Sequence, residues 1–230
     1  MTSMNIGWNA AGNTIALTVQ SEHGPLHGLL ELLPKSHGLI VLANAATTLD
    51  EREEIVATVF RAAGLSTLNV DLLSRQEEHF VDVSHNVPLL AKRLLDFLAP
   101  LKTRMLLGEI ETQPLGLHAA NATSPVVVRV AALRDHDIAA VVCRDGLIDL
   151  AGVLYLRSLE SPLLVLVGDR DEQHLASSRR ALQKVLCPHE LALIPEIGVD
   201  FATSTGFQLA AVEATQWFVK HFKADSPASR

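Results

Sequence analysis

The stretch Leu163–Glu172 reads LLVLVGDRDE and joins five apolar residues directly to a polar, charged turn. An apolar run of this length is typical of a strand that is buried on both faces of a parallel sheet. The turn Gly168–Glu172 then leads into a helical pattern at His174–Leu186. A buried strand, a polar turn and a helix in this order predict an α/β fold.

The same alternation of apolar runs and helical patterns continues along most of the chain. Besides Leu163–Val167, strands are predicted at Thr14–Gln20, Leu26–Leu33, Gly38–Ala43, Ser66–Leu72, Leu115–Ala119, Ile138–Cys143 and Leu191–Ile194. Further helices are predicted from a capping box of Thr48 and Glu51 to Gly64, at 88–99 and at Phe207–Phe222. The first two strands should flank a turn at Gly24–Pro25, and Pro100 should end or kink the second of these helices by Ala99.

Length and composition fit one well-packed domain. The chain has 230 residues, of which 48% are hydrophobic and 20% charged, which excludes a disordered or fibrous protein. We therefore predict a single α/β domain over residues 1–222, with a mostly parallel sheet, helices on both faces and no large cap domain. Residues 223–230 (KADSPASR) are predicted to form a flexible C-terminal tail.

Composition and motifs also exclude several classes of function. The net charge of −7 disfavours binding to nucleic acid. Neither G-x-G-x-x-G nor G-x-x-x-x-G-K occurs, so no nucleotide cofactor is expected. The two cysteines and ten histidines lack the spacing of metal ligands, so no metal site is expected. Without a membrane-spanning apolar run or a secretory leader, we expect a cytoplasmic protein that does not bind membranes.

The turns that follow the strands are where a function should be sought. Ligands of parallel sheets bind beyond the carboxyl ends of the strands, because the connecting loops meet there. In this chain the relevant turns are Asn44–Thr48, Ala119–Thr123, Gly168–Glu172 and Pro195–Thr205.

These turns and the strands before them resemble a known family. The stretches HGLIVLAN (37–44), GLSTLNVDLL (64–73), AAVVCRDGLIDLAG (139–152) and LLVLVGDRDE (163–172) are similar in order and spacing to the α/β-hydrolase superfamily, and in it to the dienelactone-hydrolase-like group. The resemblance covers approximately residues 26–222. It implies an α/β-hydrolase fold and hydrolysis of esters or related bonds by a Ser-His-Asp or Cys-His-Asp triad.

Two members of that triad are replaced in this chain. The resemblance places the nucleophile at Asn121 and the histidine at Val199, or at Asp200 if the loop is shifted by one residue. A carboxamide has no labile hydroxyl, and a valine cannot carry a proton. Asp171 matches the acid of the triad, but it also suits a loop or the start of a helix, and we expect this structural role.

The backbone of the nucleophile turn is expected to survive although its chemistry does not. Such a turn forces its central residue toward a positive φ, which Asn121 tolerates better than most residues do. The small neighbours Ala119, Ala120 and Ala122 leave room for it. The oxyanion turn at Asn44–Thr48 has no glycine, which makes the backbone geometry of an oxyanion hole harder to form.

An active hydrolase with another nucleophile is the alternative hypothesis. Cys143 or Ser124 would then attack the substrate, with His118 or His174 as the base. Simpler roles exist for each: a buried structural cysteine, a helix N-cap before Pro125, and hydrogen-bonded structural histidines.

The sequence thus predicts an α/β-hydrolase-fold protein that has lost serine-hydrolase activity and binds a small ligand or a protein partner. An ester hydrolase of the dienelactone-hydrolase-like type that uses Cys143 or Ser124 is the alternative. The sequence does not decide whether the protein forms a homodimer. The residues predicted to line a ligand pocket are Asn44, Ala45, His118, Asn121, Ala122, Cys143, Arg144, Asp171 and Asp200.

Overall fold

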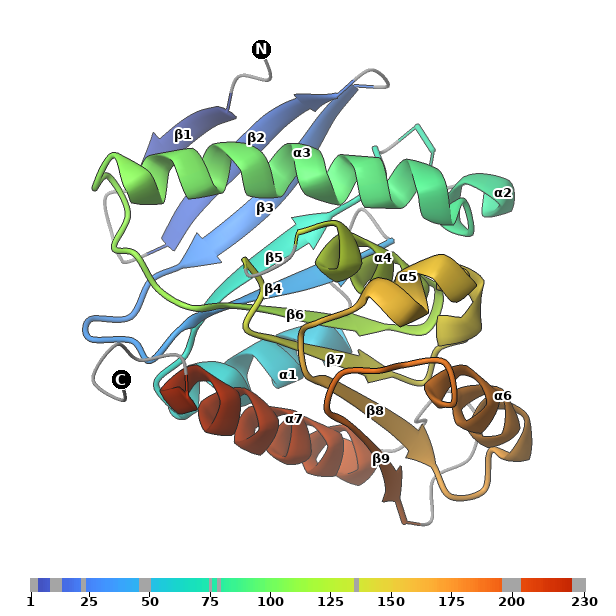
Figure 1. Cartoon of the computed structure of the whole chain (residues 1–230). Coiled ribbons are helices and arrows are strands. Elements are labelled where there is room, and N and C mark those ends of the chain that lie inside the picture. The colour runs from blue at the N-terminus through green and yellow to red at the C-terminus, as the bar shows by residue number, and fades with distance from the viewer. Residues whose placement is uncertain are drawn as a thin grey trace.

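A computed structural model describes residues 4–8, 14–21, 24–45, 51–74, 76–77, 80–134, 137–195 and 204–224. Within these residues, nine strands form one sheet with helices on both sides (Figure 1). The strands are β1 Met4–Trp8, β2 Thr14–Ser21, β3 Gly24–Glu31, β4 Leu39–Asn44, β5 Ser66–Asp71, β6 Leu115–Ala120, β7 Ala140–Arg144, β8 Leu163–Gly168 and β9 His189–Ile194. The helices are α1 Glu51–Ala62, α2 Val81–Ser84, α3 Val87–Leu106, α4 Ser124–Leu133, α5 Val153–Ser158, α6 Glu172–Leu182 and α7 Ser204–Ala224.

The sheet is mostly parallel, as predicted. Its order is β1-β2-β3-β5-β4-β6-β7-β8-β9. The pairs β1–β2, β2–β3 and β3–β5 are antiparallel. From β5 onward, through β4, β6, β7, β8 and β9, every neighbouring pair is parallel. The carboxyl ends of β6, β7 and β8 therefore lie side by side, because Ala120 pairs with Arg144 and Arg144 pairs with Leu166.

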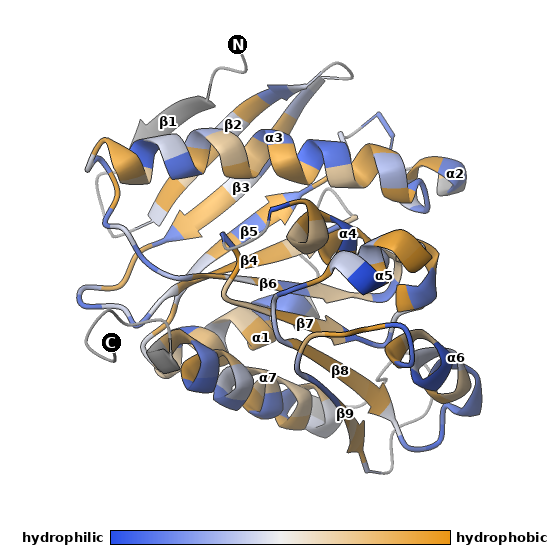
Figure 2. Ribbon diagram, viewed as in Figure 1, coloured by the Kyte–Doolittle hydropathy of each residue, from blue (hydrophilic) through white to orange (hydrophobic). Residues whose placement is uncertain are grey.

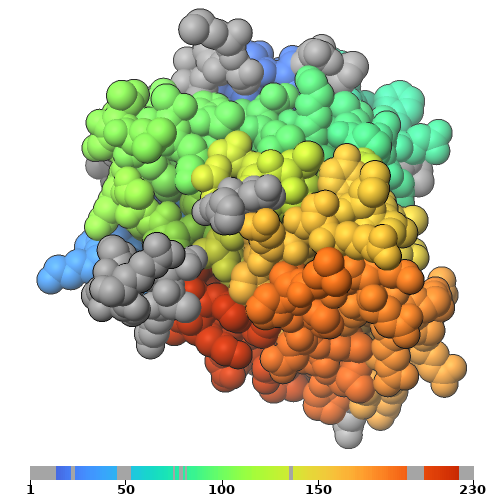
Figure 3. All heavy atoms as spheres, in the orientation of Figure 1, coloured from blue at the N-terminus to red at the C-terminus, as the bar shows by residue number. Residues whose placement is uncertain are grey.

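Two apolar layers hold the helices to the sheet. Helices α3 to α6 pack on one face, where the larger core includes Leu94, Phe97 and Val127. Helices α1 and α7 pack on the other face around Phe60 and Phe218. Figure 2 shows the apolar central strands between these layers, and the space-filling view shows α3, α5 and α6 covering one side of the sheet (Figure 3). None of the helices in the described segments is long and apolar enough to cross a membrane.

The structure differs from the sequence predictions at four places. Helix α3 continues through Pro100 to Leu106 instead of ending by Ala99, because Leu101 and Met105 extend the buried stripe beyond the proline. Gly24 and Pro25 already belong to β3, where they pair with Ser21 and Gln20 of β2. Strand β1 was not predicted; it adds an antiparallel edge beside β2. Helix α6 runs from Glu172 to Leu182, not from 174 to 186.

A buried ion pair ties the segment after β5 to helix α3. Arg93 is 1% exposed and donates hydrogen bonds to the backbone oxygen of Leu72 at 2.8 Å and to both carboxylate oxygens of Glu77 at 2.9 and 2.6 Å. Ser74 donates two more to Glu77. Burial opposes ionisation of Glu77, but these hydrogen bonds outweigh it and lower its pKa to about 2.

We expect Glu77→Gln to destabilise the protein at neutral pH, because it leaves the buried Arg93 guanidinium without a carboxylate. The expected loss is roughly 2 kcal/mol of unfolding free energy. The pKa is lowered from 4.5 to about 2, so the stabilisation is full above pH 4.5 and disappears as the pH falls through about 2. Urea unfolding of both proteins at neutral and acidic pH measures this. An equal gap between them at every pH would contradict the role given to this ion pair.

Candidate functional site

The turn after β6 has the geometry that the sequence predicts. Asn121 has φ = 50° and begins a short 3₁₀ turn, Asn121–Thr123, that leads directly into α4. The hydroxyl of Thr123 donates a hydrogen bond to the backbone oxygen of Ala120 at 2.8 Å and closes the turn. The prediction that Asn121 occupies a tight strand-to-helix turn with a left-handed backbone is confirmed.

A second left-handed residue lies beside it, at the end of β7. Asp145 has φ = 50° and follows the strand that pairs with β6. The next residue, Gly146, has no room for a side chain: a Cβ there would lie 2.3 Å from Cβ of Ser124 and 2.6 Å from the backbone oxygen of Asn121. The two strand-end turns therefore pack directly against each other.

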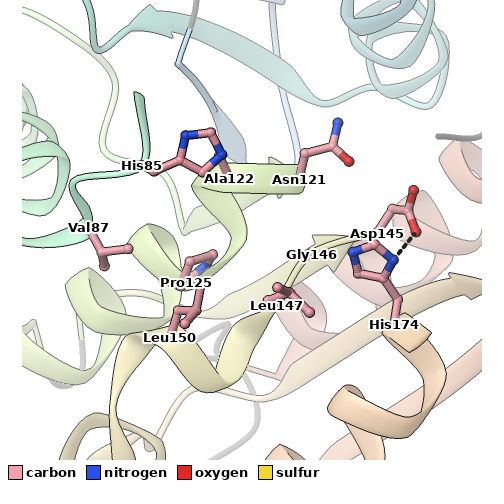
Figure 4. A pocket seen from close by; sticks show the side chains of 10 residues that line it. All are labelled: His85, Val87, Asn121, Ala122, Pro125, Asp145, Gly146, Leu147, Leu150 and His174. Atoms are coloured by element: carbon pink, nitrogen blue, oxygen red, sulfur yellow. Dashed lines mark ion pairs between the residues drawn. The ribbon is translucent and has the colours of Figure 1, made fainter. Parts of the chain in front are cut away.

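These turns border a cavity of about 210 Å³ (Figure 4). Its polar groups are two imidazoles, one carboxamide and one carboxylate, and its other lining residues are apolar or glycine. The lining residues are His85, Val87, Asn121, Ala122, Pro125, Asp145, Gly146, Leu147, Leu150 and His174. The cavity lies at the carboxyl ends of the strands, where ligands of parallel sheets bind.

Asp171, Asp145 and His174 form one cluster beside the cavity. Asp171 is the N-cap of α6, and its Oδ1 accepts a hydrogen bond from the backbone N–H of His174 at 3.0 Å. Its Oδ2 lies 2.6 Å from Nδ1 of His174, and Oδ1 of Asp145 lies 3.8 Å from the same nitrogen. Both carboxylates are buried, Asp145 at 3% and Asp171 at 2% exposure. The helix-cap role expected for Asp171 is confirmed.

A second buried cluster lies on the α1 and α7 side of the sheet, away from this cavity. Arg144 forms a short ion pair with Glu53, and its guanidinium lies 4.3 Å from the ring centre of Phe207. His118 packs edge-on against Phe60, and its Nδ1 lies 4.0 Å from Oε2 of Glu53. Burial disfavours the charged imidazole, the positive charge of Arg144 adds to this, and together they lower the pKa of His118 to about 3.

The alternative nucleophiles are buried. Cys143 has no exposed surface, and its thiol donates a hydrogen bond to the backbone oxygen of Ser124 at 3.5 Å. Burial raises the pKa of this thiol far above neutral pH, so it stays protonated. Ser124 is equally buried and donates to the backbone oxygen of Arg144 at 3.4 Å. Ser124 is also not an N-cap, because α4 begins at Ser124 itself and its N-cap position is Thr123.

The structure brings together only part of the predicted pocket. Asn121 and Ala122 line the cavity, and Asp171 contacts it through His174. Five of the other predicted pocket residues, although described, do not line this cavity: Asn44, Ala45, His118, Cys143 and Arg144. Val199 and Asp200, and with them most of the loop Pro195–Thr205 that Asp171 was expected to contact, lie outside the described residues.

Sequence reasoning did not single out Asp145 or His85. Asp145 comes directly after the buried run AVVCR, so the rule that points to strand-end turns also applies to it. His85 carries no comparable signal. It approaches the cavity because α2 and α3 bring it there, beside Val87 of the cavity wall.

The sheet order, the left-handed turn after β6 and the carboxylate after β8 define the α/β-hydrolase fold. Dienelactone hydrolase from Anabaena variabilis superposes with a TM-score of 0.81 and 26% identity, over 90% of this chain and 97% of that one. Est1E from Butyrivibrio proteoclasticus superposes at 0.71 with 12% identity, over 90% and 99% of the two chains. The chain belongs to the α/β-hydrolase superfamily and is similar to dienelactone hydrolase.

One relative found by its sequence is about twice as long as this chain. A protein of Mycobacterium tuberculosis named "Putative phosphoribosyl transferase" is 30% identical over 206 residues, which are 89% of this chain and 46% of that protein. The chain thus spans about half the length of this relative. No protein-family model matches the chain.

We expect Asp171→Ala to lower thermal stability and Asp171→Asn to preserve most of it. Alanine removes the N-cap of α6, which costs about 1 to 2 kcal/mol, whereas asparagine keeps an oxygen that can accept the hydrogen bond from His174. In a protein of this size the alanine variant should melt roughly 3 to 6 °C lower. Differential scanning calorimetry of the two variants measures this, and equal melting temperatures would refute the capping role.

We expect His118 to make the protein sensitive to mild acid. The pKa of His118 is about 3 in the folded chain, against 6.5 for an unperturbed histidine. Between these two pH values the unfolded chain therefore binds a proton that the folded chain does not. The unfolding free energy should therefore fall by about 1.4 kcal/mol per pH unit from this residue alone. Urea unfolding of His118→Leu between pH 7 and about 5 should show a flatter dependence. An unchanged slope would show that His118 is not the group responsible.

Proposed function

We propose that this chain has lost serine-hydrolase chemistry and binds a small molecule in the cavity at the carboxyl ends of β6 and β7. The left-handed Asn121 carries this proposal, because the nucleophile turn is kept while its side chain is a carboxamide. A carboxamide forms no acyl-enzyme, since it has no hydroxyl to deprotonate. The cavity beside it remains open to a ligand of small size.

The chemistry of the cavity favours a small ligand that is mostly apolar and carries a carbonyl or similar acceptor. Val87, Pro125, Leu147 and Leu150 supply apolar walls. The carboxamide of Asn121 supplies N–H donors, and the backbone N–H that follows a nucleophile turn is half of an oxyanion hole in this superfamily. These donors support binding of an uncharged oxygen without covalent attack.

The other functions that the sequence or its relatives suggest have less support. The alternative hydrolase that uses Cys143 or Ser124 loses support from the burial of both side chains. The name of the Mycobacterium tuberculosis relative describes a protein about twice as long as this chain, so the activity in that name is not assigned to this chain. A protein partner, a homodimer and a cytoplasmic location stay predictions.

We expect the unmodified protein to form no acyl-enzyme. Losing one triad member already removes most of the roughly 10⁶-fold effect on turnover. A fluorophosphonate probe should leave the folded protein unlabelled, and p-nitrophenyl acetate should show neither a burst nor a rate above that of Asn121→Ala. A saturable turnover that survives Asn121→Ala and vanishes on Cys143→Ala or Ser124→Ala would overturn this proposal in favour of the alternative hydrolase.

Ligand binding is tested with two exposed leucines. Leu150 lines the cavity, whereas Leu154 lies on α5 outside the lining, and they are 57% and 78% exposed. In a ligand-detected NMR screen of small carbonyl compounds, hits should lose at least tenfold in affinity with Leu150→Arg and be unchanged with Leu154→Arg. Equal effects of the two substitutions would place the ligand elsewhere.

A further inference from the structure

Among its described lining residues, the cavity holds a histidine that can act as a base but no hydroxyl or thiol nucleophile. Its lining includes two imidazoles, a carboxamide and a carboxylate, and none of the described lining residues has a hydroxyl or a thiol. The acid of the former triad is nevertheless engaged with a histidine. Asp171 contacts His174, three residues further along the chain. Acid–base chemistry without a covalent step is what such a set of groups supports.

The contacts of His174 define which ring nitrogen is free to act. Nδ1 lies 2.6 Å from Oδ2 of Asp171, and an ionised carboxylate only accepts hydrogen bonds. Nδ1 therefore carries the hydrogen, and in the neutral ring Nε2 carries the lone pair. Figure 4 shows this second nitrogen on the side of the ring away from Asp145, toward Leu147 and the cavity. A carboxylate that fixes the tautomer of a histidine is also the arrangement of a catalytic triad.

Asp145 adds a second carboxylate to the same histidine. Its Oδ1 lies 3.8 Å from Nδ1 of His174, and the residue is held at φ = 50° with 3% exposure. If the ring gains a proton at Nε2, the positive charge forms next to two buried carboxylates, which stabilise it. A molecule in the cavity that loses a proton to Nε2 therefore leaves the imidazolium facing two carboxylates.

We propose that His174, oriented by Asp171 and Asp145, is the general base of this cavity and removes a proton from a C–H bond next to a carbonyl. This rests on the proposed binding of a small molecule at the same site. Nε2 takes the proton, and the electron pair of the C–H bond moves into the carbonyl to form an enolate. The carboxamide N–H of Asn121 and the backbone N–H of Ala122 stabilise the enolate oxygen. The imidazolium then returns the proton to carbon, so the base is regenerated and no co-reactant is needed.

A metal ion is the competing occupant of the cluster. One ligand atom from each of Asp145, Asp171 and His174 lies within 4.8 Å of the others. However, the 2.6 Å between His174 and Asp171 is a hydrogen-bond distance. Two ligands of one zinc ion are about 3 Å or more apart, since each lies about 2.1 Å from the metal. The observed geometry favours a shared proton, and the experiment below distinguishes the two.

The test uses 5-nitrobenzisoxazole, which opens when a base removes its ring C–H proton. The C–H electron pair forms the C≡N bond, the N–O bond breaks, and a coloured cyanonitrophenolate leaves, so no nucleophile is required. We expect saturable turnover by the unmodified protein and a loss of about a hundredfold or more in His174→Gln. Asp171→Asn, which can keep the helix cap, should lower kcat about tenfold with KM unchanged. His27→Gln, at an exposed position on β3, should match the unmodified protein.

Each outcome separates this inference from the proposal on which it rests. If His174→Gln turns over the substrate as fast as the unmodified protein, the assignment of the base is overturned. The proposed loss of serine chemistry still stands in that case, provided that the fluorophosphonate probe leaves the protein unlabelled. Turnover that disappears with EDTA and returns with Zn²⁺ overturns it in favour of a metal site. If His174→Gln is misfolded by circular dichroism, the kcat of Asp171→Asn decides: an unchanged kcat overturns the proposal.

Discussion

The left-handed turns at the ends of β6 and β7 are the constraint on which the site depends. Asn121 and Asp145 both have φ = 50°, and the strands before them pair so that Ala120 lies opposite Arg144. Positive φ is costly for residues other than glycine, and Asn and Asp bear this cost best. The backbone of Asn121 and the side chain of Ser124 pack directly against Gly146, which has no side chain. A change of backbone conformation in one turn would therefore displace the other.

Buried charge is divided between the two faces of the sheet in different ways. On the α1 and α7 side, Arg144 is paired with Glu53, and burial together with the positive charge of Arg144 lowers the pKa of His118. At the cavity, two buried carboxylates lie within 4 Å of Nδ1 of His174. Two histidines of one small domain thus have opposite electrostatic surroundings. The second lines the cavity at the strand ends, where we propose that it transfers a proton.

The similarity to dienelactone hydrolase is a similarity of scaffold. A TM-score of 0.81 shows that the two folds superpose, and in this chain the turn after β6 has a left-handed residue, Asn121. Function in such folds depends on the side chains at the strand ends. Here Asn121 stands in the left-handed turn after β6, and Asp171 has a histidine partner in the helix that it caps. The proposed non-covalent use of the site rests on these side chains.

The sequence by itself determined the fold class, the parallel strands and the residue at the nucleophile turn. Apolar runs such as Leu163–Val167 need burial on both faces, and only an α/β sheet provides it, so local pattern was sufficient. It failed at Pro100, where packing of Leu101 and Met105 outweighs a missing hydrogen bond. It also could not find the contacts of His174, since Asp145 is 29 residues away in sequence and is brought near by strand pairing and backbone torsion. Which side chains meet at the cavity was decided by the tertiary structure, because contacts between strand ends depend on register and on turns that residue type alone does not specify.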